Sequence, residues 1–444
     1  MSRQSARRVL AATCIGNFGE IYDFAVVGFS VPVLALHFFP ASDPTAAVLS
    51  TFAAYAIAFF ARPLGGLIFG VLADKIGRIK ILSMTVILMS AGTALIGVLP
   101  TYATVGLAAP VAFVLCRIAQ GLAMGGETTS SSSYILEWSP DDRRGWWQGV
   151  NWFFSFSPNA FTALFVLGVQ FAMGHSAYTE WGWRIPFLAG GLVGIVGFWL
   201  RRRLDDAEEF KQASRETPVE NPLAAVARSG LMSMLHVIII EIVLSIGAYI
   251  LLGFMYTFLV KQARLDPLLA LMSNAVAILV LATFLAIAGG LSDRIGRKPV
   301  LTLGAAWVAL AAYPALHLAS SGSFAGALAG QVLLAMGVGI YSGAAFITMP
   351  ELFPTSFRAT GLSLSYQLAV AVFGGTTPFI ATWLVHAFGS PLAPGVYTAL
   401  AGVAGLLLVQ FVPETRWVQL RTSVGTSPTD ETMTSVDKPR AKLR

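Results

Sequence analysis

Charged residues are scarce in this sequence. Asp, Glu, Lys and Arg make up 12% of its 444 residues and hydrophobic residues make up 56%, whereas about a quarter of a typical soluble domain is charged. A soluble core cannot use so much apolar sequence. Runs of about 20 apolar residues span the ~30 Å hydrocarbon layer of a bilayer. Because such runs recur along the chain, the composition predicts a membrane protein.

Cysteine is nearly absent, and the short motifs of catalytic sites are missing. Cys14 and Cys116 both lie in apolar runs, which is typical of small buried residues and not of a disulfide or a metal site. The sequence has no serine nucleophile elbow, no zinc-ligand pair and no Gly-Lys-Ser/Thr phosphate loop. We therefore expect no enzymatic activity, no cofactor, no metal and no direct use of ATP.

A cleavable signal peptide is not indicated either. The first apolar run extends over 9–39 and contains Glu20 and Asp23, so it predicts a spanning helix and not a short leader. The net charge of +6 would fit a nucleic-acid binder, but the basic residues gather in short clusters between the apolar runs. Membrane topology explains that distribution, and we expect no nucleic-acid partner.

The apolar runs predict about twelve spanning helices and hence an all-α polytopic membrane protein. The polar clusters on one side carry most of the Lys and Arg residues, which places both termini in the cytoplasm by the positive-inside rule. The expected spans are 9–38, 48–73, 80–99, 107–136, 146–173, 184–201, 230–260, 267–291, 299–319, 323–350, 360–388 and 394–412.

One long polar stretch divides the spans into two sets of six. It covers 201–229, is charged and contains Pro218 and Pro222, as expected of a cytoplasmic linker. The end of the chain is rich in Ser, Thr, Pro and charge, which predicts a disordered cytoplasmic tail. The expected domains are a six-helix bundle at 1–200, the linker at 201–229, a second six-helix bundle at 230–412 and the tail at 413–444.

An internal repeat relates the two halves. The segment 70–78, GVLADKIGR, returns at 289–297 as GGLSDRIGR, an offset of 219 residues. The segment 137–140, EWSP, returns at 351–354 as ELFP, an offset of 214 residues. Both offsets are close to half of the chain. Two homologous bundles facing each other across a site are typical of transporters that rock between two states.

The repeated motifs carry charges that can close one end of such a site. The motif Asp can cap a helix N-terminus, and the motif Arg can reach a carboxylate across the bundle interface. The alternative is that these charges only set topology and loop folding, but their repetition in both halves favours a gate. The predicted cytoplasmic gate consists of Asp74, Arg78, Glu137, Arg144, Asp293, Arg297, Glu351 and Arg358.

Further motifs accompany the repeated loop, at 16–24, 62–66, 117–121, 125–127, 181–187, 351–355, 365–367, 373–375 and 413–415. The loop motif resembles the signature loop of the major facilitator superfamily, and these segments are similar to its metabolite:proton symporter family. The resemblance implies a twelve-helix protein of a bacterial inner membrane that takes up small organic acids or zwitterions with protons; we expect a monomer. Ile21, where the family usually has an aromatic residue, and the hydroxyl run at 128–133 depart from the pattern.

Carboxyl groups at membrane depth are the candidates for proton coupling. Glu20 and Asp23 lie three residues apart on one helical face, near mid-membrane, and Glu127 is a third candidate. A carboxylate at that depth is costly unless it is paired, hydrated or protonated, which suits a group that loads and releases a proton. The alternative for each is a fixed hydrogen bond to a neighbouring helix.

Arg117 is the one basic residue that we expect well inside the membrane zone of the first bundle. It could pair with Asp23, bind a substrate carboxylate through both guanidinium edges, or form a permanent salt bridge. Other polar and aromatic residues at this depth more often pack or anchor helices, and we expect packing for most of the hydroxyl run. The candidate substrate-binding residues are Asn17, Tyr22, Arg117, Gln120, Glu241, Tyr249, Tyr341, Tyr366 and Gln367.

These features favour a proton-coupled symporter that imports a small metabolite by alternating access. Carboxylates are the preferred substrates because of Arg117, and osmolytes such as proline or betaine come second. The main alternative is a proton-driven exporter of a metabolite or drug, but the segment 153–168 lacks the Gly-x-x-x-Gly-Pro-x-x-Gly-Gly pattern that is usual in superfamily antiporters. A solute receptor that does not transport is a further alternative.

Overall fold

The computed structural model describes residues 3–39, 44–201, 221–418 and 420, and within these ranges a few side chains, that of Glu20 among them, are not described. The described residues form helices and no strands. The helices of the first half are α1 (Arg3–Phe38), α2 (Pro44–Ile76), α3 (Arg78–Val98), α4 (Tyr102–Val105), α5 (Ala108–Trp138), α6 (Arg144–Phe156), α7 (Pro158–Met173), α8 (His175–Ala177) and α9 (Arg184–Arg201).

The second half repeats this plan. After a short α11 (Pro222–Ala225) it again contains six spans, of which the first and the fifth are divided. Its other helices are α12 (Leu231–Tyr249), α13 (Met255–Lys261), α14 (Pro267–Ile295), α15 (Arg297–Ala319), α16 (Phe324–Glu351), α17 (Arg358–Ala369), α18 (Thr377–Phe388) and α19 (Ala393–Leu408).

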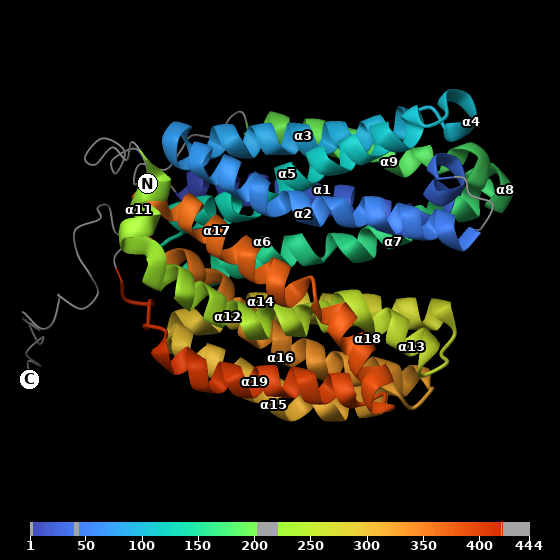
Figure 1. The fold of residues 1–444 in the computed structure, drawn as a ribbon. Coiled ribbons are helices and arrows are strands. Elements are labelled where there is room, and N and C mark those ends of the chain that lie inside the picture. Colours follow the sequence, from blue (N-terminus) through green and yellow to red (C-terminus); the bar gives the residue numbers. More distant parts are fainter. Residues whose placement is uncertain (1–2, 40–43, 202–220, 419, 421–444) are drawn as a thin grey trace, which may run out of the picture.

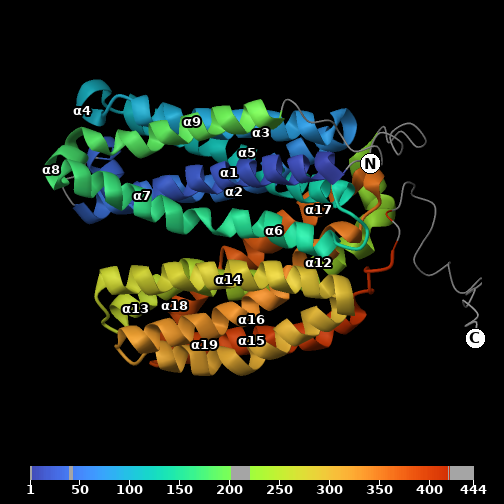
Figure 2. The ribbon, with the colours of Figure 1, turned by 180° about the vertical axis from the view of Figure 1, so that it is seen from behind.

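The helices form two bundles that lie side by side (Figure 1). Eleven described helical segments are long and apolar enough to cross a membrane, and α1 runs alongside them (Figure 1). Between the bundles, α6 packs against α14 and α2 against α17, and Figure 2 shows α6 and α7 facing α14 from behind. This arrangement agrees with the all-α membrane protein that the apolar runs predict.

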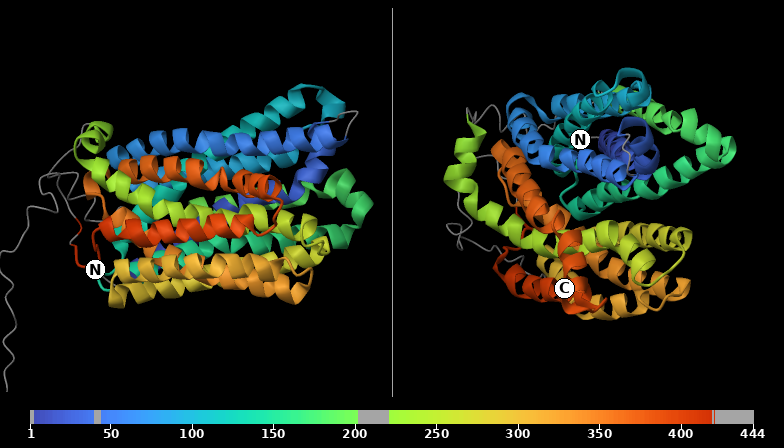
Figure 3. Two further views of the ribbon diagram at one scale, coloured as in Figure 1. Left: turned by 60° about the horizontal axis from the view of Figure 1, so that its bottom comes forward. Right: turned by 45° about the vertical axis from the view of Figure 1, so that its right-hand side comes forward.

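The start of α1 and the residues that follow α19 lie at the same end of the bundles, which we call the termini end (Figures 1 and 3). The opposite end is the far end. The surface between the bundles, where α2, α5 and α6 meet α14, α16 and α17, is called the seam. Figure 3 shows the helices of both bundles running roughly along one direction, so the seam extends from the termini end toward the far end.

Three of the expected spans are interrupted. Pro158 has no backbone N–H to donate, and the fifth span is divided between α6 and α7 just before it. One π-helical turn, Ile250–Phe254, joins α12 to α13, and another, Val370–Gly374, follows α17. The sequence shows apolar length but not these breaks, because a π-helical turn needs no change in hydrophobicity.

The repeated loop motif is mostly helical. α2 ends at Ile76 and α14 at Ile295, several residues beyond the predicted ends at 73 and 291. The connecting loops shrink to Gly77 and Gly296, whose φ angles of 106° and 105° favour glycine. Asp74 and Asp293 therefore sit on the last turns of helices, which fixes the direction in which they point.

The four predicted domains stay a prediction, because much of the linker at 201–229 and of the tail at 413–444 lies outside the described residues. The first tail residues are described and need a correction. The Glu414 carboxylate accepts hydrogen bonds from the backbone N–H groups of Arg297 at 2.9 Å and Lys298 at 3.0 Å. Instead of being disordered, the start of the tail caps the N-terminus of α15.

Candidate functional site

Each repeated Asp caps a helix of the opposite bundle at the termini end. Asp74, in the first bundle, accepts hydrogen bonds from the backbone N–H groups of Ala359 at 3.3 Å and Thr360 at 2.8 Å and from the Thr360 hydroxyl at 2.6 Å. These groups belong to the first turn of α17. The positive end of the helix dipole and the unpaired N–H groups both favour a carboxylate there.

The second half repeats this contact in the other direction. Asp293, in the second bundle, accepts hydrogen bonds from the backbone N–H groups of Gly145 at 2.7 Å and Trp146 at 2.8 Å. These two residues form the first turn of α6, in the first bundle. The two bundles thus exchange caps at the termini end, one for each copy of the motif.

Buried ion pairs surround the Asp74 cap. Arg78 is fully buried and pairs with Asp74 and, at 3.0 Å, with the Glu137 carboxylate. Arg358, from the second bundle, reaches the same Glu137 oxygen at 3.0 Å. Across the seam, Arg78 donates to the Thr355 carbonyl oxygen at 3.0 Å. The expected carboxylate partner of Arg78 therefore lies in its own bundle, and Arg358 makes the ion pair that crosses the seam.

The Asp293 cap has a matching set of charges. Arg297 holds Glu351 through two hydrogen bonds, at 3.2 Å and 3.1 Å, and pairs with Asp293 at 2.7 Å. Arg144, from the first bundle, approaches Glu351 at 3.8 Å. Thr415, in the first tail residues, donates to the same carboxylate at 2.6 Å. All eight predicted gate residues thus lie in two clusters at the seam, and their role as a gate stays a proposal.

Close packing continues along the seam above the charges. A methyl group added at Gly145 would lie 2.2 Å from the Gly289 carbonyl oxygen, so the α6 and α14 backbones touch only because both residues are glycine. Further from the termini end, the Trp152 and Phe346 rings stack with centroids 3.6 Å apart and planes inclined by 14°. The bundles are therefore in direct contact from the charged clusters to this aromatic pair.

A small pocket opens beside the aromatic pair. The centre of a water-sized sphere can occupy about 10 Å³ of the pocket, so the pocket holds about one water molecule. Hydroxyl side chains of α5 line one wall, and aromatic or apolar side chains of α6, α16 and α17 line the others. The lining residues are Thr128, Thr129, Ser132, Trp152, Phe346, Met349, Pro350, Leu362 and Tyr366. We call it the seam pocket.

The hydroxyl run at 128–133 serves both packing and the pocket. Thr128 bonds the Met124 carbonyl oxygen, as expected of a packing role, and Ser131 donates to Asn17. Thr129 lines the pocket, and its hydroxyl has no hydrogen-bond partner among the described residues. A buried hydroxyl without a partner is costly, so Thr129 has an unused donor where a ligand would lie.

The proton-coupling candidates are buried within the first bundle. Asp23 is fully buried and accepts a hydrogen bond from Ser90 of α3 at 3.0 Å, while its other oxygen has no partner among the described residues. Glu127 accepts a hydrogen bond from Thr85 of α3. The side chain of Glu20, the third predicted carboxyl, lies outside the described residues.

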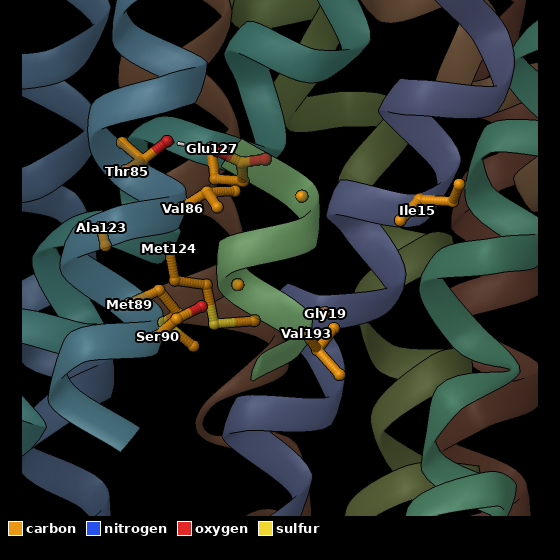
Figure 4. A pocket seen from close by; sticks show the side chains of 12 residues that line it. Ile15, Gly19, Thr85, Val86, Met89, Ser90, Ala123, Met124, Glu127 and Val193 are labelled. Carbon is orange, nitrogen blue, oxygen red and sulfur yellow. Dashed lines mark hydrogen bonds between the residues drawn. The ribbon is translucent and has the colours of Figure 1, made fainter. Parts of the chain in front are cut away.

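A cavity connects the surroundings of these two carboxyl groups. Thr85, Ser90 and Glu127 line it, and Figure 4 shows Thr85 and Glu127 joined at one end of the cavity, with Ser90 further along. It lies between α1, α3, α5 and α9 and also has about 10 Å³ for the centre of a water-sized sphere. It has room for about one water molecule.

Arg117 belongs to a polar chain inside the first bundle. Its side chain is fully buried and donates to the side-chain amide oxygen of Gln120 at 2.7 Å, and the Gln120 amide nitrogen donates to the Thr93 hydroxyl at 2.7 Å. Thr93 in turn contacts Asp23. Arg117 and Asp23 are thus connected through intermediate side chains of α5 and α3. A direct substrate contact of Arg117 or Gln120 stays a prediction, which this geometry does not favour.

Arg62 corrects one sequence-based expectation. It lies within α2 and is only 7% exposed, so Arg117 is not the one basic residue inside the membrane zone of the first bundle. The signal was present in the sequence, because Arg62 interrupts the apolar run predicted at 48–73. Trp152 and Phe346 were also missed. Trp152 lies near the start of the span predicted at 146–173, where tryptophan commonly anchors a helix at the interface, so no sequence signal indicated the stacked pair.

Most of the other predicted substrate residues are held within their own bundle. Asn17 bonds Asn151 at 2.9 Å, and the Tyr22 hydroxyl donates to the Pro186 carbonyl oxygen at 2.8 Å. In the second bundle, Glu241 accepts from Ser245 at 2.6 Å and the Tyr341 hydroxyl donates to the Ile240 carbonyl oxygen at 3.1 Å.

Three further candidates come from α12 and α17. Tyr249 packs against Gly374 in the second bundle. Tyr366 lines the seam pocket, and Gln367 donates across the seam to the Gly125 carbonyl oxygen at 3.1 Å. Of the nine predicted substrate residues, these last two are the ones whose described contacts reach the seam.

Comparison with known proteins places the fold and the family. The family model described as "Major Facilitator Superfamily" matches residues 13–364. The proline/betaine transporter of Salmonella typhimurium is 34% identical over 414 residues, which cover 90% of this chain and 82% of the relative. OusA of Dickeya dadantii, a glycine betaine/proline/ectoine/pipecolic acid transporter, is 32% identical and covers 92% of this chain and 83% of its own.

Solved structures agree. The proton:xylose symporter XylE superposes with a TM-score of 0.76 at 20% identity and covers 95% of this chain and 98% of its own. The fucose:proton symporter FucP of E. coli superposes with a TM-score of 0.71 at 12% identity and covers 93% of this chain and 100% of its own. The predicted twelve-helix fold is confirmed, and the absence of an enzymatic role fits a family of transporters. The chain is a multi-pass membrane protein that belongs to the Major Facilitator Superfamily.

Proposed function

We propose that this protein is a proton-coupled symporter that imports a small zwitterionic osmolyte, of the proline and betaine class, into a bacterial cell. Relatives at 32–34% identity over nine-tenths of the chain bear names that refer to this substrate class. The earlier preference for organic acids depended on Arg117, and the fully buried position of Arg117 within the first bundle removes that support.

The observation that carries the proposal is the composition of the seam pocket. Thr129 offers an unpaired hydroxyl from the first bundle, while Trp152 and Tyr366 offer aromatic faces from the two bundles. A hydroxyl can donate to a carboxylate, and aromatic faces attract a quaternary or secondary ammonium group. The pocket holds about one water molecule in the described state, so a zwitterion would enter only when the bundles move apart. With both groups in one small molecule, it would then contact both bundles at once.

The closed termini end supports alternating access. Both exchanged helix caps and both charge clusters lie there, on the side that carries the basic residues of the topological bias. We infer that this side faces the cytoplasm and that the gate described here is the cytoplasmic gate in its closed state. Rocking of the bundles would break the caps and expose the seam pocket to the cell interior.

Asp23 and Glu127 are the proposed proton carriers. Each accepts a hydrogen bond from a hydroxyl group of α3, an arrangement that a protonated carboxyl group can also use because a hydroxyl can accept as well as donate. Their depth in the bundle makes the charged form costly. Proton loading at these residues would therefore be linked to the packing of α1, α3 and α5.

Uptake of labelled glycine betaine and proline into proteoliposomes tests the proposal. With an acidic exterior, we expect accumulation above the external concentration, and we expect a protonophore to abolish it. Vesicles without a pH gradient are the control. Accumulation driven by an acidic interior would instead select the exporter, and tight binding without any uptake would select the receptor.

A further inference from the structure

Arg62 is a buried cation that belongs neither to the proposed gate nor to the proposed proton carriers. Its residue is 7% exposed, and among the described residues its side chain makes no hydrogen bond and no ion pair. The contact that the structure gives it is the Phe59 ring, 5.5 Å from the guanidinium carbon. Its Nε is buried without an acceptor, whereas the two terminal nitrogens are not among the fully buried atoms. A buried guanidinium N–H without an acceptor is costly, so an Arg kept in this place calls for a partner that binds there.

The gate arginines are different. Arg78, Arg297 and Arg358 are also buried, and each pairs with a carboxylate at about 3 Å. Arg117 donates to Gln120. Arg62 is therefore distinguished by its lack of an acceptor and not by its burial.

Helical geometry places Arg62 at the seam. Gly66, one turn further along α2, faces α17, because a methyl group added there would lie 2.5 Å from the Ser363 hydroxyl oxygen. Ala58, one turn back, meets Gly121 of α5. Arg62 lies between these two directions, so its side chain is directed at the junction of α5 and α17, where the two bundles meet.

The position of Arg62 along α2 suits a ligand that enters the seam pocket. Gln367, which bonds the Gly125 carbonyl oxygen across the seam, lies at the level of Gly66. Helical side chains lean toward the helix N-terminus, and α2 begins at the far end, so the guanidinium lies on the far-end side of the Gln367 contact. A solute that arrives from the far end would meet Arg62 before it reaches the seam pocket.

We propose that Arg62 binds the carboxylate of the transported substrate. The planar guanidinium offers two parallel N–H donors to a carboxylate, and the Phe59 ring leaves the donor edges unused. The assignment rests on the proposed function, and it gives the zwitterion an anchor for its negative end near the aromatic walls that suit its positive end. In this assignment Arg62 takes the role that the sequence suggests for Arg117.

Binding to purified protein tests the assignment. Isothermal titration with glycine betaine compares the wild type with Arg62→Gln and Arg62→Lys. We expect Arg62→Gln to weaken binding by at least about tenfold, the cost of one charged hydrogen-bond pair, and Arg62→Lys to fall between. Lys261→Gln, an exposed change at the end of α13, is the matched control and should bind like the wild type. Unchanged affinity in Arg62→Gln overturns the assignment.

Two further measurements separate binding from folding. Without ligand, we expect Arg62→Gln to melt at the same temperature as the wild type or higher, because the change removes an uncompensated buried charge; a lower melting temperature would point to a structural role instead. Choline, which has the ammonium group of betaine but no carboxylate, should bind the wild type and Arg62→Gln alike. Loss of betaine binding in Arg117→Gln but not in Arg62→Gln would return the role to Arg117.

The same titrations distinguish failure of the two proposals. If the wild type binds an organic acid such as succinate but neither betaine nor proline, and Arg62→Gln loses that acid, the substrate class is wrong and the Arg62 assignment stands. If betaine binds and Arg62→Gln retains it, the substrate class stands and the assignment fails. If no compound with a carboxylate binds, both proposals fail.

Discussion

Three carboxyl groups inside the bundles accept hydrogen bonds from hydroxyl groups: Ser90 donates to Asp23, Thr85 to Glu127 and Ser245 to Glu241. The carboxylates at the termini end also accept from guanidinium groups, beside the hydroxyl groups of Thr360 and Thr415. An arginine partner holds a carboxylate in its charged form, whereas a hydroxyl partner suits both protonation states. The residue types thus separate sites that can change charge from sites that cannot.

Asp23→Asn tests this separation. We expect the variant to lose proton-driven accumulation of substrate while counterflow exchange stays measurable, because Asn can keep the Ser90 contact but cannot release a proton. Uptake against a pH gradient and exchange without one, in the same proteoliposomes, provide the measurement. Asp142→Asn, at a side chain that is 77% exposed, is the control; accumulation at the wild-type level by Asp23→Asn would remove Asp23 from the coupling.

At the residue scale, the sequence indicated which helix carries each polar group better than the direction in which the group points. Asp23, Arg117 and Glu241 lie within long apolar helices, but their side chains turn into their own bundles. In a soluble protein the apolar face of a helix marks its buried side, but lipid and the protein interior are both apolar. The pattern around Arg117 therefore could not indicate whether it faces the seam, and the contact of Gln120 with Thr93 of α3 became visible only in the packed structure.

Single elements carry the link between the two bundles. The N-termini of α17 and α6 receive their caps from Asp74 and Asp293, which stand on helices of the opposite bundle. A helix is usually capped by a residue just before its own start. In the proposed opening, separation of the bundles would remove the capping group, so the stability of two helix ends would depend on the state of the proposed gate.

Asp74→Ala should favour opening of the termini end. Loss of a cap costs about 1 kcal/mol, which shifts the ratio of open to closed molecules by roughly fivefold. A cysteine at position 363, within the seam, reports opening by its rate of reaction with a maleimide after Cys14 and Cys116 are replaced. The rate should rise in Asp74→Ala and stay unchanged in Asp142→Ala; equal rates in both would show that the Asp74 cap does not hold the gate.

The sequence predicted the number of spans but not where every helix ends. Twelve apolar runs gave twelve spans, since length and hydrophobicity suffice to cross a bilayer. The extension of α2 to Ile76 was not expected, because the polar residues near its end read as a loop. The Asp74 carboxylate near this end is hydrogen-bonded by α17 of the other bundle. Such a tertiary contact has no local signature in the sequence.

The whole molecule is held in one state by backbone contact along the seam. Gly145 and Gly289 allow α6 and α14 to touch, and a methyl group at Gly289 would lie 2.3 Å from the Gly145 carbonyl oxygen. No real side chain fits at such a distance without a shift of one bundle. The closed state is therefore sensitive to a single added carbon.

Gly289→Ala should push the bundles apart at the termini end. Spin labels at Lys80 and Arg294, exposed positions on the first and second bundles, report their separation. We expect the distribution of label-to-label distances to shift to longer values relative to the labelled protein that retains Gly289. Gly168→Ala, where an added methyl group meets nothing within 4 Å, should leave the distribution unchanged, and an unchanged distribution in Gly289→Ala would contradict the proposed closed contact.

The exchanged caps also bear on the leakage of protons. If the hydrogen bonds of one capping carboxylate break, the other carboxylate still connects the two bundles, so a brief local fluctuation opens no continuous path. Protons would cross without solute only when both attachments fail at the same moment, which is far rarer than either failure alone. Such redundancy would limit how much stored electrochemical energy each idle molecule dissipates.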